Sequence, residues 1–229
     1  MTVTMIKGNI FATRAQTIVN TINCVGVMGA GIALEFRLRQ PEMFEKYATL
    51  CEEKKIRPGI LWLYRAENQW ILNFPTKDHW KHPSKPKYLE LGLQKFAATY
   101  RTKGITSIAF PLLGADKGGL AKEVSLQIMR QYLDPLPDIS VEIYEYSREA
   151  HDDLYQQVEK AVLSQDLGEL SRSTGINKAT LQKIIDAMHS GTVFQISQLG
   201  QLPGVGPTTV QKLFQIGLTT TAQGSLFPG

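Results

Sequence analysis

Segments with strand and helix signatures alternate over residues 1–146, and this alternation limits the fold more than any other feature of the sequence. Residues 105–114 (ITSIAFPLLG) form a nearly continuous apolar run, which is typical of a strand buried on both faces. Amphipathic stretches at 87–104 and 120–133 flank that run and show apolar residues at helical spacing. Shorter β-branched runs and a hairpin pattern at 59–76 predict further strands. The pattern predicts an α/β fold, a three-layer α/β/α sandwich with a mixed sheet.

The pattern changes after Tyr146. Residues 148–165 have the pattern of a charged helix. After them the sequence predicts only short helices, separated by Gly and Ser-Thr residues. We therefore expect a larger α/β domain at 1–147, a helical connector at 148–165 and a small all-α domain at 166–229. No internal repeat is evident in the sequence.

Charge and cysteine content restrict the partner class and the compartment. The formal net charge is +4 at pH 7 and the pI is about 9.0, which permits a nucleic-acid partner without requiring one. Cys24 and Cys51 lack metal-ligand spacing, so we expect no metal site or disulfide framework, and a reducing cytoplasm fits. No signal peptide and no apolar run of membrane-spanning length is evident, so no membrane partner is expected.

Two glycine-rich loops are the main candidates for ligand binding. The first covers residues 23–31 (NCVGVMGAG) and precedes a helix. The second covers 111–120 (PLLGADKGGL) and lies between a buried strand and a helix. Glycines let backbone N–H groups approach an anion, and a helix N-terminus adds a favourable field. Two such loops predict a diphosphate clamp, whereas a purely structural alternative is that Gly29 and Gly31 permit close helix–sheet packing.

Four stretches together resemble the macrodomain family, the ADP-ribose-binding fold. They are GNIF at 8–11, TIVNTINCVGVMGAGIALEF at 17–36, FPTK at 74–77 and PLLGADKGGL at 111–120. Within the family they resemble DarG-type macrodomains, which remove ADP-ribose from DNA modified by the toxin DarT. They are also similar to the terminal ADP-ribose glycohydrolase of animals. The resemblance covers about residues 1–146 and implies ADP-ribose as ligand, with no cofactor.

The resemblance implies a set of ADP-ribose-binding positions. At the adenine end they are Gly8, Asn9 and Ile10, with Tyr146 stacking on the base, or Tyr144 if the strand register differs. Near the distal ribose they are Asn20 and Asn23. The first phosphate loop comprises Gly29, Ala30, Gly31 and Ile32, after Met28. The second comprises Leu113, Gly114, Ala115, Asp116, Gly118, Gly119 and Leu120. Many macrodomains carry Asp where this chain has Asn9, whose amide oxygen also accepts a hydrogen bond but carries no charge.

Lys77, directly after Thr76, matches the lysine that attacks C1″ of the distal ribose in the glycohydrolases that the chain resembles. This chemistry needs a neutral amine, and both partial burial and the charge of Lys81 would lower the pKa of Lys77. The alternative is that Lys77 is one of several solvated lysines in a basic loop.

The chain departs from the animal enzyme at the residue that assists the lysine. That enzyme has an aspartate in the second loop, where this chain has Gly118, and Asp116 lies two residues earlier. If Asp116 does not reach the site, the proton is transferred by water, a substrate phosphate or His79.

The segment after Lys77 is a candidate DNA contact. Trp80 is expected either to stack on an unpaired base or to be a core or rim aromatic. Lys81 is expected to contact phosphates, together with Lys77, Lys85 and Lys87.

The last helices have two candidate motifs. Residues 167–188 have the rhythm of a helix-turn-helix. Residues 203–207 (PGVGP) resemble the turn of a helix-hairpin-helix, in which hairpin N–H groups bind DNA phosphates without base readout. The resemblance assigns this contact to Gly204 and Gly206, with Lys212 as the nearest cation. The alternatives are a protein-contact module or a packed helical pair. The region does not resemble the large toxin-binding C-terminal domain of long DarG proteins.

The leading interpretation is an ADP-ribosyl glycohydrolase that removes ADP-ribose from a nucleobase, thymidine in single-stranded DNA, and so reverses a DarT-like ADP-ribosyltransferase toxin. One alternative is an ADP-ribose reader without turnover. Another is a hydrolase that acts on ADP-ribosylated protein or O-acetyl-ADP-ribose.

Overall fold

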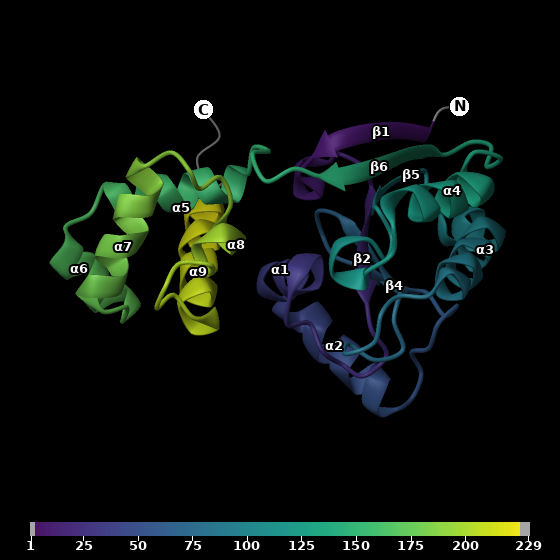
Figure 1. Ribbon diagram of the computed structural model, residues 1–229, viewed down its shortest axis with the longest axis horizontal. Coiled ribbons are helices and arrows are strands. Elements are labelled where there is room, and N and C mark those ends of the chain that lie inside the picture. Colours follow the sequence, from purple (N-terminus) through teal and green to yellow (C-terminus); the bar gives the residue numbers. More distant parts are fainter. Residues whose placement is uncertain (1–2, 225–229) are drawn as a thin grey trace. The chain divides into compact units, whose positions relative to one another are not determined.

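The computed structural model describes residues 3–224, and the chain divides into two compact units, Met1–Tyr146 and Ser147–Gly229 (Figure 1). Each unit is described by itself. Within the described residues, every helix is too short or too polar to cross a membrane.

The first unit is built on a mixed six-stranded sheet. Its strands are β1 (Val3–Gly8), β2 (Thr17–Ile22), β3 (Trp62–Arg65), β4 (Trp70–Pro75), β5 (Ser107–Pro111) and β6 (Ser140–Tyr146). Their order is β1-β6-β5-β2-β4-β3, and only the β3–β4 pair is antiparallel. The β3–β4 pair is the hairpin that the sequence predicts at 59–76.

Helices cover both faces of this sheet (Figure 1). They are α1 (Gly31–Arg39), α2 (Pro41–Glu52), α3 (Pro86–Lys103) and α4 (Lys122–Leu133). Two separate apolar cores result, one containing α3 and α4 residues and the other α1 and α2 residues. Neighbouring residues of β2 divide between them, with Val19 in the first core and Ile18 in the second, as the two-residue period of a strand requires. The predicted α/β/α fold is confirmed.

Close packing of α3 on the sheet depends on Gly92. A Cβ at this position would lie 2.1 Å from Cζ of the buried Phe74 ring on β4. We expect Gly92→Ala to lower the free energy of unfolding by about 3 kcal/mol, because neither the ring nor the helix has room to move. Chemical denaturation measures this change. Ala98→Gly, at an exposed position of the same helix, is expected to cost only about 1 kcal/mol through helix propensity. Wild-type stability of Gly92→Ala would contradict the packing.

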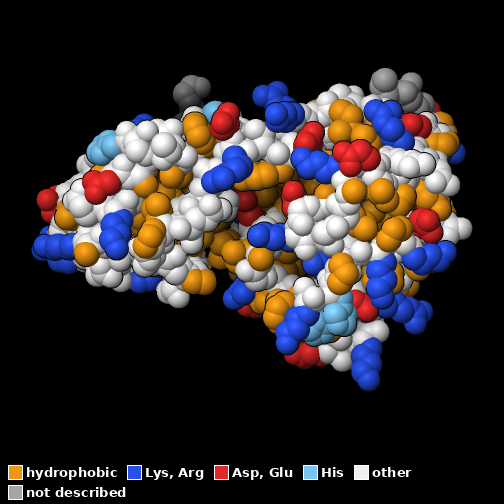
Figure 2. Space-filling view, in the orientation of Figure 1, with side chains coloured by type: hydrophobic (Ala, Val, Ile, Leu, Met, Phe, Trp, Pro, Cys, Tyr) orange, Lys and Arg blue, Asp and Glu red, His pale blue; other side chains and the backbone are white. Residues whose placement is uncertain are grey.

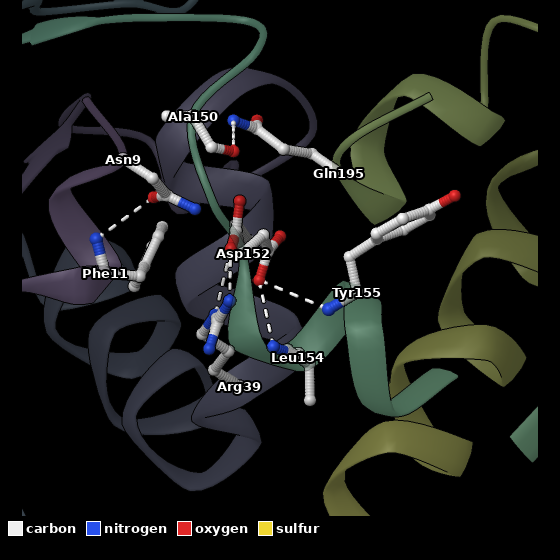
Figure 3. Close-up of polar contacts among 9 residues, drawn as sticks. Asn9, Phe11, Arg39, Ala150, Asp152, Leu154, Tyr155 and Gln195 are labelled. Carbon is white, nitrogen blue, oxygen red and sulfur yellow. Dashed lines mark hydrogen bonds and ion pairs between the residues drawn. The ribbon is translucent and has the colours of Figure 1, made fainter. Parts of the chain in front are cut away.

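The second unit is all-helical within its described residues. It contains α5 (Asp153–Leu163), α6 (Leu167–Thr174), α7 (Lys178–His189), α8 (Ile196–Leu199) and α9 (Pro207–Gly224). Asp152 caps α5 by accepting hydrogen bonds from the N–H groups of Leu154 (3.1 Å) and Tyr155 (3.3 Å), as Figure 3 shows. Gln195 donates to the carbonyls of Ser147 (3.0 Å) and Ala150 (3.5 Å), which fixes the start of the unit. The segment expected to be a connector therefore packs inside this unit.

The second unit also contains an internal repeat that is not evident from the sequence pattern. The hairpins α6–α7 and α8–α9 match at one constant offset, with buried apolar residues at equivalent positions. The matched pairs are Leu170 with Leu199, Gly175 with Gly204, Ile176 with Val205, Leu181 with Val210, Lys183 with Lys212 and Ile184 with Leu213. Each lysine reaches the turn of the other hairpin: Lys183 donates to Pro203 O (3.3 Å) and Lys212 to Gly175 O (2.9 Å).

Candidate active site

The carboxyl ends of the parallel strands lie at one edge of the sheet, and the conspicuous loops of the first unit leave from this edge. The first glycine loop follows β2, the Lys77 segment follows β4, and the second glycine loop follows β5. In parallel α/β sheets this edge is where ligands bind.

The first glycine loop is held in shape by Asn23. Its amide oxygen accepts from the N–H groups of Val25 (3.0 Å) and Val27 (3.3 Å) and from the hydroxyl of Tyr47 (3.1 Å). Its amide nitrogen donates to the Val27 carbonyl. Asn23 is buried with both polar atoms engaged, so the structure gives it a role in shaping the loop. Direct contact with the ribose, as the resemblance implied, stays a prediction.

The end of this loop presents free backbone donors. Gly29, Ala30 and Gly31 are exposed, Ile32 is half-buried, and Met28 is buried beneath them. Helix α1 begins at Gly31, whose φ is +56°, and no side chain caps it. The first N–H groups of an uncapped helix lack intrahelical partners, so they are available to an anion.

The second loop has a compact internal structure. Backbone bonds run from Leu120 N to Gly114 O (3.0 Å) and from Gly118 N to Ala115 O (2.7 Å). Gly114 and Gly119 have φ of +69° and +80°. Within the described residues, the N–H groups of Asp116 and Lys117 make no hydrogen bond. Buried positions Leu113, Gly114, Ala115 and Gly118 form the base of the loop.

The two loops meet at Lys77. A Cβ on Gly31 of the first loop would lie 3.6 Å from Cγ of Lys117 in the second. Nζ of Lys77 donates to the Lys117 carbonyl at 2.6 Å. Cys24 ties the base of the first loop to the same place, because its Sγ lies 3.2 Å from Lys77 O and its N donates to Asp78 O (3.1 Å). The structure thus brings the predicted nucleophile and both predicted phosphate loops together.

Burial lowers the pKa of Lys77 below its ordinary value, as expected. The second expected cause, the charge of Lys81, does not contribute. Among the described residues no carboxylate hydrogen-bonds Lys77. Asp116 is exposed, with φ of +45°, and Asp78 instead accepts from His82 and Tyr88. Nδ1 of His79 lies 3.2 Å from Lys81 N. The described structure therefore shows no carboxylate or imidazole hydrogen-bonded to the Lys77 amine, and the choice among Asp116, His79, water and a substrate phosphate stays a prediction.

This environment predicts a pH dependence. If neutral Lys77 attacks the sugar, kcat/KM should rise with pH through a midpoint below 10.5 and then level off, because deprotonation produces the nucleophile and burial lowers the pKa. A pH–rate profile measured from neutral to alkaline pH tests this prediction. A rate that falls throughout that range would contradict it.

The expected adenine end lies where β1 and β6 finish side by side. Gly8 pairs with Tyr146, which is 48% exposed, whereas Tyr144 is 8% exposed and lies in the core. Tyr146 is therefore the more accessible of the two candidates for stacking. Asn9 is buried beside Ile10, and one lone pair of its amide oxygen caps a short 3-10 helix by accepting from Phe11 N (3.1 Å; Figure 3).

Asn20 and Thr76 lie deeper in the fold than the resemblance suggests. Asn20 is fully buried and donates to the amide oxygen of Asn73 at 2.9 Å, while its own oxygen has no partner in the described structure. Thr76 is buried, and its N–H donates to Ile22 O.

The sequence analysis missed Asn73, although a polar residue within the apolar run QWILNFPT was a usable signal. It also missed Tyr47, the support of Asn23. In residues 3–224 no side-chain cluster suits a metal ion.

Comparison with known proteins agrees with this fold. Residues 19–129 match the family described as Macro domain. The solved macrodomain of Thermus aquaticus DarG is 36% identical with a TM-score of 0.60, and the match covers 63% of this chain and 98% of that one. The solved macrodomain of Mycobacterium tuberculosis DarG is 38% identical with a TM-score of 0.62, and the match covers 64% of this chain and 99% of that one. The chain belongs to the macrodomain family, and its resemblance to DarG-type macrodomains is confirmed.

The matched proteins also include longer chains. A Thermus aquaticus protein named DNA ADP-ribosyl glycohydrolase is 37% identical over 144 residues, which is 61% of this chain and 40% of the relative. Thermosipho africanus DarTG, solved in complex with ADP-ribose, is 34% identical with a TM-score of 0.60, covering 66% of this chain and 43% of that one. This chain thus spans about 40% of the length of the curated relatives named DNA ADP-ribosyl glycohydrolase.

Proposed function

We propose that the chain is an ADP-ribosyl glycohydrolase that removes ADP-ribose from a modified nucleobase in DNA, with Lys77 as nucleophile. The observation that carries the proposal is the position of the Lys77 amine, 2.6 Å from the Lys117 carbonyl and between two glycine loops with free N–H groups. The names of the DNA ADP-ribosyl glycohydrolase relatives support the reaction class.

The residues have separate tasks in this proposal. The N–H groups at the start of α1 and those of Asp116 and Lys117 hold the diphosphate from two sides. The neutral amine of Lys77 attacks C1″, and the C1″–base bond breaks with its electron pair going to the base, which then takes up a proton. Water later attacks the same carbon and releases ADP-ribose from the lysine.

The proposed substrate is thymidine in single-stranded DNA, and the proposed partner is a DarT-like toxin. A Thermosipho africanus relative named as a fusion of a DNA ADP-ribosyl transferase and a DNA ADP-ribosyl glycohydrolase supports such a pairing. The charge distribution supports DNA: the first unit carries 19 of the 25 Lys and Arg residues but 14 of the 21 Asp and Glu residues. Both cysteines are free thiols, which fits the cytoplasm as the compartment.

The second unit is proposed to contact the DNA backbone through its hairpin turns. Gly204 has φ of +86°, and α9 begins at Pro207 shortly after Gly206, so N–H groups are presented at this turn. The expectation that Lys212 is the cation at this turn is wrong: Lys183 donates to Pro203 O (3.3 Å), whereas Lys212 donates to Gly175 O at the turn of the other hairpin (2.9 Å). The unit has six basic and seven acidic residues, so its contribution is local positioning rather than long-range attraction.

The test is release of ADP-ribose by the whole chain from three substrates: a modified single-stranded oligonucleotide, a modified protein and O-acetyl-ADP-ribose. Release from the oligonucleotide with the highest kcat/KM supports the proposal. Faster release from either other substrate assigns a different hydrolase activity. Tight binding of ADP-ribose with no release from any of them identifies a reader.

A further inference from the structure

An exposed aromatic and basic segment leaves the candidate active site directly after the nucleophile. Residues 77–87 (KDHWKHPSKPK) contain four lysines, two histidines and one tryptophan, against a single acidic residue. Figure 2 shows the histidine side chains of the first unit at its surface, with lysine and arginine side chains around them. Of the alternatives given for Trp80, a core position is excluded, because its side chain is 49% exposed.

The aromatic side chains of this segment contact one another, and the rings of His79 and Trp80 are stacked. The ring centroids of His79 and Trp80 are 5.7 Å apart, with an interplanar angle of 25°, and those of His79 and His82 are 5.3 Å apart. The Lys81 ammonium lies 5.1 Å from the centroid of the Trp80 ring. The result is a short aromatic ladder that has lysine beside its exposed tryptophan.

Hydrogen bonds support the ladder at its base, although it is exposed. Asp78 accepts hydrogen bonds from His79 N (2.8 Å), His82 Nδ1 (3.3 Å) and the Tyr88 hydroxyl (3.3 Å). Desolvation alone would raise the pKa of Asp78, but these hydrogen bonds together lower it, so the carboxylate stays ionised. At the far end, Ser84 N donates to Gly118 O of the second glycine loop at 2.8 Å. The segment that carries Trp80 is thus anchored on both sides of the ring before any ligand binds, which lowers the entropic cost of binding.

The charge of the segment is directed to solvent. Lys81, Lys85 and Lys87 are exposed. Among the residues that the structure describes, the one ion pair made by these three lysines is a long contact between Lys87 and Glu90, at 3.7 Å. Such exposed pairs are weak and exchange readily with other anions.

We propose that residues 78–87 are the docking surface for the unpaired DNA strand that carries the ADP-ribose, with a base stacked on Trp80 and phosphates on Lys81 and Lys85. This inference rests on the proposed function. The base displaces the Lys81 ammonium from the ring, and the freed ammonium pairs with a phosphate. Because the segment begins at Lys77, a strand on this surface leaves its modified base beside the nucleophile. A duplex cannot offer an unstacked base to Trp80, so the surface selects single strands.

The experiment compares two substrates with the same modified base, an ADP-ribosylated mononucleoside and an ADP-ribosylated single-stranded oligonucleotide. We expect Trp80→Ala to lower kcat/KM about ten-fold for the oligonucleotide and to leave the mononucleoside unaffected, because the variant cannot form the base–aromatic stack. Trp80→Phe should restore most of the activity. Val124→Ala, at an exposed apolar position on α4, is the control and should act on both substrates as wild type does.

Two results of that comparison overturn the inference. An equal decrease on both substrates shows that Trp80 only shapes the active site, and no decrease on either shows that the strand binds elsewhere. The same variant is also tested on an ADP-ribosylated protein. A decrease seen only with that substrate would assign the surface to protein binding and would overturn the inference as well.

A binding measurement keeps the inference separate from the proposed function. Fluorescence anisotropy with an unmodified single-stranded oligonucleotide needs no turnover. Replacing Lys81 and Lys85 with Gln should reduce the slope of log K against log salt by roughly 0.7 for each phosphate that the variant no longer binds, whereas Lys95→Gln on α3 should not. An unchanged slope, or duplex bound as tightly as single strand, overturns the inference. If the chain binds the unmodified single strand as predicted but releases ADP-ribose from neither modified substrate, the proposed function is refuted and the inference about the docking surface stands.

Discussion

Replacing Lys77 with alanine is expected to reduce ADP-ribose release from a modified oligonucleotide by roughly a thousand-fold or more, because the reaction loses its nucleophile. Asn23 shapes the first glycine loop and backbone hydrogen bonds shape the second, to which the Lys77 side chain adds one bond, to Lys117 O, so ADP-ribose affinity should change little. Single-turnover release measured by chromatography, together with calorimetric titration of ADP-ribose, separates the two effects.

Lys77→Arg distinguishes nucleophilic attack from electrostatic help. Arginine keeps the positive charge but stays protonated, so it should be as inactive as alanine. Lys95→Ala, at an exposed lysine on α3 away from the loops, should retain wild-type release. A Lys77→Arg variant with activity near wild type would show that the charge, not the amine, matters.

Gly114→Ala is expected to weaken ADP-ribose binding by about 10- to 100-fold through distortion of the second loop. Its φ of +69° is unfavourable for alanine, and the added Cβ would lie 2.8 Å from Leu120 Cδ1 and 2.9 Å from Ser84 Cβ. Backbone strain and overpacking of this kind each cost about 1–3 kcal/mol. Calorimetric titration with ADP-ribose measures the affinity, and denaturation measures the accompanying decrease in stability.

Gly104→Ala is the matched control for backbone strain. Gly104 ends α3 with φ of +74°, and a Cβ there approaches only Trp70, at 3.9 Å. The Gly104→Ala substitution should lower the stability of the fold modestly and leave the affinity for ADP-ribose unchanged. An equal decrease of affinity in both variants would mean that the second loop has no specific part in binding.

The fold and the centre of the site were predictable because their signals are local. The apolar run at 105–114 became β5, and the hairpin pattern became β3 and β4. The stretch FPTK places Lys77 at the carboxyl end of β4, where parallel topology brings it to the glycine loops. The strand pattern predicts where this residue lies, whereas its assignment as nucleophile came from the resemblance to macrodomain glycohydrolases.

The roles of the buried amides were not predictable, because partners far along the chain decide them. Asn23 is turned inward by Tyr47 of α2, and Asn20 by Asn73 of β4. The repeat in the second unit was hidden for a different reason. Its first helices differ in length, eight residues in α6 and four in α8, so the match becomes clear only when the turns at Gly175 and Gly204 are aligned.

The most direct test of the central claim is covalent trapping at Lys77. Attack of the amine expels the base, and opening of the sugar ring leaves an iminium at C1″ that borohydride reduces to a stable secondary amine. Turnover of a modified oligonucleotide with borohydride present, followed by peptide mass spectrometry, should place ADP-ribose on Lys77 in the wild type and nowhere in Lys77→Arg. Efficient release of ADP-ribose with the trapped sugar on another lysine, such as Lys117, would contradict the account.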